Sequence, residues 1–386
     1  MELRRIADAL GIATYPAELD TCGKETGIDL LTLVETLQEQ YDLFGSYYDA
    51  VKTAAKQISD DPVRLGWCQT VWAYLKDATL GQARAIPVPA SDGTAAGGLL
   101  GLMMLLPCVE MSVRNYRERG LDETVILQTV RAYQGSMAVV EGRTGRPGID
   151  KTYYNWLCLY AKALIFNFGG FNFEVRKMGR DALYLRNKKD GTVKCLLCSG
   201  SVHSSGMILG SGEYEDEAGA WQAEFRETEE AFIGYPIENN RVSKSMQTYS
   251  KDSWECVLRF GDDVIGLHIP RKTDLSPASV ERALEEGRIL ARKAYPEYDL
   301  KAFHCHSWLL DPALEVMLGD GSNIAAFAKR FVRYPVNSSG QEVFGFVLSG
   351  KLESYAQLPE NTRLLRELKK KYLNGGQITA FAGVIF

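Results

Sequence analysis

The feature that most constrains the fold is a change of hydrophobic period at the loop GRTGRPG, residues 142–148. Before this loop, apolar residues recur every three or four positions, as at Leu31, Val34 and Leu37. From Phe171 onward, apolar and polar residues alternate. A period near 3.6 is typical of amphipathic helices and a period of two is typical of strands. The sequence therefore predicts a helical front part and a back part rich in strands.

The loop GRTGRPG combines the strongest breakers of regular structure, so we place a domain boundary there. With 386 residues the chain is long enough for two domains. The predicted domains are 1–147 and 148–386. Hydrophobic residues make up 46% of the chain, which is enough for a full core in each domain without disulfides.

The composition also predicts where the protein works. The start MELRRIADAL has acidic residues and no apolar segment of the signal-peptide kind. Eight scattered cysteines then fit a reducing compartment, so we expect a cytoplasmic protein. No block of lysines and arginines is interleaved with aromatic residues, so no nucleic-acid partner is expected. The longest apolar run, Leu99 to Leu106, is too short to span a bilayer, and we expect a buried helix and no membrane partner.

The back part contains a strand–helix–strand unit inside a series of strands. Val264 to Ile269 and Phe303 to Leu310 have strand character, and a helix begins at Ser276-Pro277 between them. Such a crossover joins parallel strands within an otherwise antiparallel sheet. Asp190-Gly191 and Gly261-Asp262-Asp263 each predict a hairpin, and Val343 to Leu348 is strand-like. The predicted class is α+β, with a mixed α/β second domain.

The loop between the first crossover strand and its helix has the features of an anion site. Arg271 and Lys272 follow the strand, and Ser276 begins the helix. The amide groups and dipole at a helix start favour an anion, and the two cations would add to this. The alternative is a plain loop with two solvated cations.

The second crossover strand reads FHCHSWLLDP. In a strand, His304 and His306 lie on one face with Trp308 and Leu310, while Cys305 lies on the other, which disfavours a Cys–His nucleophile pair. Three interpretations stay open. The histidines, with His268, hold a metal; they are polar strand-end residues; or they line a cleft, where one acts on an amine or hydroxyl.

The segments GDDVIGLHIPRKTDLSP, FHCHSWLLDPALEVML and SNIAAFAKRF, in this order, resemble a bacterial acyltransferase-domain family. Its members have a helical N-acyltransferase N-terminal domain followed by a GNAT-like C-terminal domain. The resemblance implies a largely antiparallel sheet that splays open between two central parallel strands, where the arm of an acyl-CoA inserts. The diphosphate then lies at the start of the crossover helix. The loop here reads PRKTDLSP, without the glycines usual in GNAT enzymes, which predicts that cations take their place.

The resemblance thus implies an acyl-CoA-dependent N-acyltransferase that uses acetyl-CoA or another acyl-CoA and a small-molecule amine, and we expect a homodimer. The expected catalytic residues are His304, His306 and Ser307, with one of the two histidines as the general base. The expected cofactor-binding residues are His268, Ile269, Arg271, Lys272 and Ser276.

Two other functions compete with this one. A GNAT-shaped domain without the glycine-rich loop can serve as a non-catalytic module that binds a small molecule or a partner in an assembly. A metal-dependent hydrolase would use His268, His304 and His306 as ligands.

Overall fold

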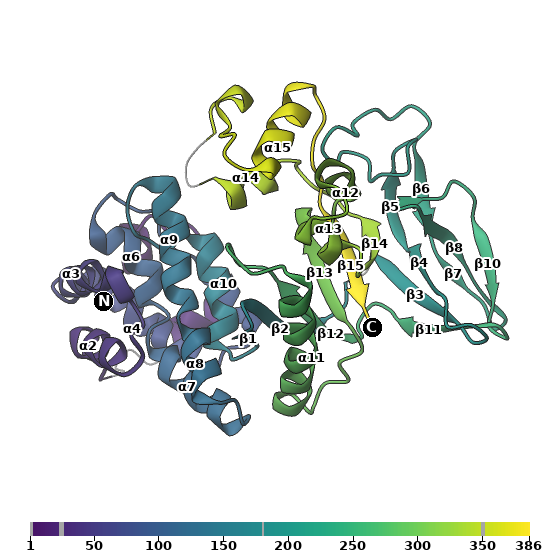
Figure 1. Cartoon of the computed structure of the whole chain (residues 1–386). Helices are drawn as coiled ribbons and strands as arrows, with labels where there is room; N and C mark the ends of the chain where they lie inside the picture. The colour runs from purple at the N-terminus through teal and green to yellow at the C-terminus, as the bar shows by residue number, and fades with distance from the viewer. Residues whose placement is uncertain (1–2, 23–26, 180, 349–351) are drawn as a thin grey trace. The chain divides into compact units, whose positions relative to one another are not determined.

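The computed structural model describes residues 3–22, 27–179, 181–348 and 352–386. It divides into two compact units, residues 1–168 and residues 169–386, each of which is described by itself (Figure 1). The first unit is helical and the second contains nearly all the strands. The predicted α+β class, with a helical front part, is confirmed.

The first unit consists of helices joined by short loops and ends in a short strand. Its elements are α1 (Leu3–Ala9), η1 (Ala17–Thr21), α2 (Leu30–Tyr41), η2 (Gly45–Tyr47), α3 (Tyr48–Ser59), α4 (Pro62–Leu75), α5 (Leu80–Ala85), α6 (Ala95–Met103), α7 (Pro107–Glu118), α8 (Glu123–Val130), α9 (Ala132–Thr144), α10 (Lys151–Ala161) and β1 (Ile165–Phe168).

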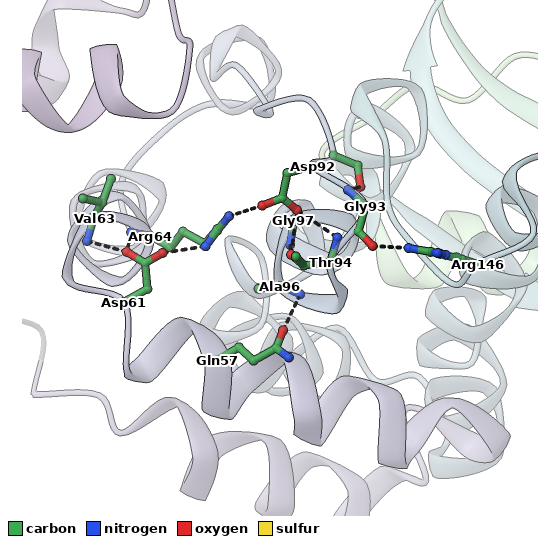
Figure 2. Close-up of polar contacts among 11 residues, drawn as sticks. Gln57, Asp61, Val63, Arg64, Asp92, Gly93, Thr94, Ala96, Gly97 and Arg146 are labelled. Atoms are coloured by element: carbon green, nitrogen blue, oxygen red, sulfur yellow. Dashed lines mark hydrogen bonds and ion pairs between the residues drawn. The ribbon is translucent and has the colours of Figure 1, made fainter.

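A polar network ties the starts of α4 and α6 together (Figure 2). Asp61 caps α4 by accepting a hydrogen bond from the amide of Val63 at 2.9 Å. Its other carboxylate oxygen pairs with Arg64 at 2.5 Å, and the same guanidinium reaches Asp92 in the loop before α6. Asp92 in turn accepts from the amide of Thr94 at 3.0 Å. Thr94 caps α6, because its hydroxyl accepts from the amide of Gly97 at 3.0 Å. Helix caps of this kind each contribute about 1 kcal/mol, so the network fixes where both helices begin.

The units divide after Phe168, later in the chain than the boundary that we predicted at 147/148. The GRTGRPG segment begins inside α9, which ends at Thr144, and the loop that follows lies against α6 and the residues before it. It does not link independent domains. Arg146 donates to the carbonyl of Gly93 (Figure 2). The amide of Ile149 donates to the carbonyl of Gly98 at 2.9 Å. A Cβ at Gly101 would lie 2.7 Å from the carbonyl oxygen of Ile149, so glycine is what lets the two backbones approach.

The apolar run in α6 is a buried core segment, as expected. Leu99, Leu100 and Leu102 each expose at most 1% of their surface. The segment Ala95–Glu118 is long and apolar enough to cross a membrane by length and composition, but 78% of its most apolar window is buried inside the protein. Core helices of soluble proteins meet the same test, so this burial agrees with a core helix.

The second unit contains two large sheets, one small sheet and several helices. Its strands are β2 (Phe171–Lys177), β3 (Ala182–Asn187), β4 (Val193–Leu197), β5 (Ser199–Val202), β6 (Trp221–Glu224), β7 (Arg226–Glu227), β8 (Ala231–Glu238), β9 (Arg241–Val242), β10 (Gln247–Ser250), β11 (Trp254–Leu258), β12 (Asp263–His268), β13 (Phe303–Ser307), β14 (Val332–Pro335) and β15 (Phe381–Ile385). Its helices are α11 (Pro277–Ala294), η3 (Trp308–Leu310), α12 (Pro312–Leu318), α13 (Asn323–Ala328), α14 (Glu342–Val347), η4 (Tyr355–Gln357) and α15 (Arg363–Leu373).

The first sheet of this unit has the order β2-β12-β13-β15-β14. The strands β12 and β13 are parallel and α11 connects them, so the predicted crossover is confirmed (Figure 1). All other pairs in these five strands are antiparallel. Helix α11 covers one face, where a Cβ at Gly287 would lie only 2.5 Å from the ring of Phe173. Glycine at this position therefore lets α11 pack closely against β2.

The second sheet has the order β10-β8-β4-β3-β11, with β7 and β9 also paired to β8. The predicted hairpin at Asp190-Gly191 is confirmed, because it joins the antiparallel strands β3 and β4. The predicted hairpin at 261–263 is wrong: β11 pairs with β3 and β12 with β2, so this turn passes from one sheet to the other. The ring of Tyr184 meets that of Tyr334 with centroids 6.5 Å apart, which places β3 next to β14.

The strand expected over Val343–Leu348 is also wrong, since α14 runs through Val347 and Leu348 is its C-cap. The carboxylate of Glu342 starts the helix. It accepts from the amide of Ser339 at 2.7 Å and from the hydroxyl of Ser338 at 2.9 Å. The dipole of a helix favours an acidic residue in its first turn, and this one is also held by the preceding turn. Neither effect is visible in the apolar pattern of VFGFVL.

Candidate active site

The two parallel strands separate in the middle of the sheet. Pairing between β12 and β13 extends only over Ile265↔Phe303 and Gly266↔His304. Beyond this point β12 continues to pair with β2, and β13 continues to pair with β15 as far as Ser307. The strands therefore run on apart, each held by its outer neighbour. This is the splayed sheet that the resemblance implied.

One face of the sheet carries a group of polar side chains beside this opening. Glu174 lies opposite Gly266 in the ladder, and Gly266 lies opposite His304, so all three share a face. By alternation His268 belongs to the same face. A Cβ on Gly266 would lie 2.6 Å from Arg176 Nε and 3.1 Å from Glu174 Oε2. The missing side chain at this position leaves room for the two charged groups to cross β12.

Glu174 and His268 form a hydrogen-bonded pair at the end of β12. His268 Nε2 lies 2.8 Å from Glu174 Oε2. The carboxylate side chain is 11% exposed and the imidazole is 35% exposed. A carboxylate accepts the bond, so Nε2 carries the proton and, in the neutral ring, Nδ1 carries the lone pair. A largely buried carboxylate that orients a more exposed imidazole is the arrangement of a general base.

His304 is in a different state, because it lies against a cation. Arg176 Nη2 is 2.5 Å from His304 Nδ1. A guanidinium only donates, so Nδ1 accepts and the proton lies on Nε2. Burial and then the charge of Arg176 lower the pKa of His304 from 6.5 to about 3. The ring is neutral at physiological pH, and its acceptor nitrogen is already engaged. This favours His304 as a hydrogen-bond donor over His304 as the base that we expected.

The buried neutral His304 should make the protein less stable in acid. Its pKa is depressed in the folded state, so the unfolded chain binds more protons between about pH 6.5 and 3. The free energy of unfolding should therefore fall as pH falls through this window, by up to about 1.4 kcal/mol per pH unit for one group. Urea titrations from pH 7 to 4 should show a shallower loss for His304→Gln than for wild type. His203→Gln is the control, and equal slopes in all three proteins would contradict this account.

His306 lies further along the same face and is exposed. Partial burial of the imidazole, and then the charge of Arg176, lower the pKa of His306. The carboxylates of Glu342 and Asp181 act in the opposite direction. Among the described residues, none makes a hydrogen bond to its ring. His306 therefore has the exposure that a base needs but no side chain that orients it, in contrast to His268.

Ser307, which we expected among the catalytic residues, acts as a cap in the structure. Its hydroxyl accepts from the amide of Leu309 at 3.1 Å and begins the turn η3. Because this turn ends the strand at Ser307, Trp308 and Leu310 do not continue the histidine face, which corrects our prediction. Asp311 caps α12, as its position before Pro312 suggests.

The expected cofactor-binding residues lie together in the loop between β12 and α11. Ile269 follows β12 and belongs to an apolar cluster that also contains Trp308. Arg271 donates to the carbonyl oxygen of Leu348 at 2.7 Å and also to that of Gly345, so its guanidinium is turned towards α14. Lys272 is exposed. It adopts a left-handed backbone with φ of 67°, a conformation more usual for glycine.

Ser276 begins α11, as predicted, but its hydroxyl donates to Asp274 at 2.9 Å and does not cap the helix. Asp274, Glu174 and Arg176 were all missed in the sequence. The sequence did indicate Glu174 and Arg176, because polar residues occupy every second position of the buried strand FNFEVRK. A charged residue that alternates with phenylalanine and valine inside a sheet indicates a polar inner face.

The structure does not support a metal centre at the histidines. In the described ranges, no group of three histidine, cysteine, aspartate or glutamate residues is placed to hold a metal ion. Arg176 already occupies Nδ1 of His304, and its positive charge disfavours a second cation at this ring. The metal-dependent hydrolase therefore loses its ligand set.

Two family models match successive parts of the chain. The model of the N-acyltransferase N-terminal domain matches residues 34–162, and that of the GNAT-like C-terminal domain matches residues 165–385. No curated protein matches the chain.

Solved structures with the same fold include an acyltransferase in complex with decanoyl-CoA, at 16% identity and a TM-score of 0.68. Another holds decanoyl-CoA and teicoplanin, at 17% identity and a TM-score of 0.67. A mutant acyltransferase in complex with octanoyl-CoA gives the same two values. Each comparison covers 100% of this chain and 99% of the other. At these identities the likeness shows the fold, while the family model covers more than half of the chain. The chain belongs to the family with a GNAT-like C-terminal domain, preceded by an N-acyltransferase N-terminal domain.

Proposed function

We propose that this protein is an acyl-CoA-dependent N-acyltransferase whose reaction takes place at the opening between β12 and β13. The observation that carries the proposal is the Glu174–His268 pair at the end of β12, beside the point where the two parallel strands part. Membership of the family supports it, as do the acyl-CoA molecules bound by three acyltransferases of the same fold.

In this proposal the thioester arm of the donor lies between the separated strands. Backbone N–H groups near the end of β12 polarise the thioester carbonyl, because they point at the position where negative charge develops. The amine nitrogen attacks the carbonyl carbon directly. A C–N bond forms, the C–S bond breaks, and CoA leaves as its thiol. No acyl group is transferred to the protein.

His268 is the general base of this scheme. Its Nδ1 takes a proton from the attacking amine, and Glu174 stabilises the resulting imidazolium through Nε2. This proton then protonates the departing thiolate. His304 keeps its proton on Nε2 because Arg176 occupies Nδ1, so it serves as a neutral donor on the same face. His306 is the alternative base, since it is exposed and, among the described residues, no hydrogen bond engages its ring.

We propose a small-molecule amine as the acceptor. One of the acyltransferases with this fold was crystallised with teicoplanin, a small molecule compared with a protein substrate. The cytoplasmic location and the homodimer are proposed on the sequence reasoning alone.

The test is release of free thiol from decanoyl-, octanoyl- and acetyl-CoA in the presence of a panel of amines, read with a thiol reagent. We expect thiol release that depends on both donor and amine, with the acylated amine found by mass spectrometry. A protein that binds the donors but transfers no acyl group to any amine would instead support the non-catalytic binding module.

A further inference from the structure

The start of helix α11 is already occupied by a carboxylate of the protein itself. Asp274 Oδ1 accepts from the amide of Ser276 at 2.9 Å. Its Oδ2 accepts from the hydroxyl of Ser276 at 2.9 Å and from that of Ser279 at 2.6 Å. The hydrogen bond from Ser279, followed by those from Ser276, lowers the pKa of Asp274, so the group is an anion at neutral pH.

This arrangement matters because the same helix start is where a diphosphate would bind. The α11 helix is 18 residues long, and its dipole favours one negative group in front of its first turn. Asp274 supplies that group and uses both serine hydroxyls. A diphosphate at this position would meet a fixed negative charge and donors that are already engaged.

The neighbouring cations do not offset this carboxylate equally. The guanidinium of Arg271 is held by two carbonyl groups at the end of α14. Both cations are exposed, but within the described ranges Lys272 makes no hydrogen bond or ion pair, so it is the one whose charge is free to meet a donor phosphate. The cation whose charge acts on Asp274 is Arg282 of α11, so part of the positive charge near the helix start already offsets this carboxylate and not a ligand. The loop is therefore left with little net attraction for an anion.

We propose that Asp274 is a specificity-determining residue of the donor site, which weakens recognition of the diphosphate so that the protein selects its donor by the acyl-pantetheine arm. The inference rests on the proposed function. An acyl-CoA binds with its arm between β12 and β13, and its diphosphate either stays off the α11 start or displaces Asp274 from it. Acyl-pantetheine, which lacks the diphosphate, then binds nearly as well as acyl-CoA.

The test compares decanoyl-CoA and decanoyl-pantetheine by calorimetry on wild type and on Asp274→Asn. Asparagine keeps an oxygen for the amide of Ser276 but removes the charge. We expect wild type to prefer decanoyl-CoA by less than about tenfold, and Asp274→Asn to bind decanoyl-CoA roughly threefold more tightly. The affinity for decanoyl-pantetheine should not change, and the gain for decanoyl-CoA should shrink at high salt.

Asp216→Asn is the matched control, because it makes the same change of charge at an exposed loop residue that accepts from the amide of Ala218. Asp274→Ser is a second variant, with a neutral group that still accepts a hydrogen bond. Unchanged or weaker binding of decanoyl-CoA by both Asp274 variants would overturn the inference while the proposed function stands. Binding of neither donor by any of the proteins would overturn the proposed function itself.

Discussion

Replacing His268 with alanine should lower the rate of acyl transfer by about a thousandfold, within the range that a general base contributes, while the donor still binds. The reason is the geometry at the end of β12, where Glu174 holds the imidazole at 2.8 Å and fixes which nitrogen carries the lone pair. The measurement is kcat from thiol release, together with the donor Kd from calorimetry. A loss confined to kcat would identify His268 as a group of the chemical step.

Two further variants separate His268 from its neighbours. Glu174→Gln keeps a hydrogen-bonding side chain beside His268 but removes the charge, so it should lower kcat less and shift the pH dependence of kcat. His203→Ala is the control and should leave kcat unchanged, because His203 follows β5, which belongs to a different sheet, and its ring bonds to Ser205. If His306→Ala abolishes transfer while His268→Ala retains it, the base is His306, as the sequence suggested.

Replacing Glu315 with alanine should destabilise the second unit by about 3–5 kcal/mol, the usual cost of stranding one partner of a buried ion pair. Arg333 Nη1 lies 2.6 Å from Glu315 Oε1, and the two side chains are 7% and 21% exposed. The same guanidinium donates to the carbonyl of Leu310 at 3.2 Å. The pair therefore holds α12 and the turn after β13 against β14, and with them the end of the histidine strand.

Removing the charge of Arg333 as well should restore most of the stability that is lost when Glu315 is replaced. The double variant Glu315→Leu with Arg333→Met fills the same space with apolar side chains and should recover most of the stability. The measurement is the midpoint of urea unfolding, with Asp320→Ala as an exposed control in the Asp320–Lys329 pair. A Glu315→Ala midpoint close to that of wild type would show that the pair contributes little.

The crossover was predictable because its parts are local. Ser276-Pro277 marks the helix start, and the segments on either side of the helix, VIGLHI and FHCHSWLL, each have strand character. The point where β12 and β13 separate was given by the family resemblance and not by the residues. It depends on which outer strand each one pairs with, and such pairings join residues between 74 (Ser307 and Phe381) and 96 (His268 and Asn172) positions apart.

The site was predictable only where it depends on local alternation, and not where it depends on which strands pair. Strand alternation places His304 and His306 on one face, but it does not show that Arg176 comes from another strand to occupy His304. His268 was expected near the cofactor, and its carboxylate partner follows only from the pairing of β12 with β2. The register of the sheet therefore decides which nitrogen of His304 accepts a hydrogen bond, and which histidine has a carboxylate partner.

The most direct test of the central claim is hydrogen exchange of the whole chain with and without decanoyl-CoA, followed by mass spectrometry. If the donor inserts between the separated strands, exchange should slow in peptides that cover residues 264–272 and 303–308. The account predicts this protection for decanoyl-CoA at saturating concentration. Protection in neither segment, or protection only elsewhere in the chain, would contradict it.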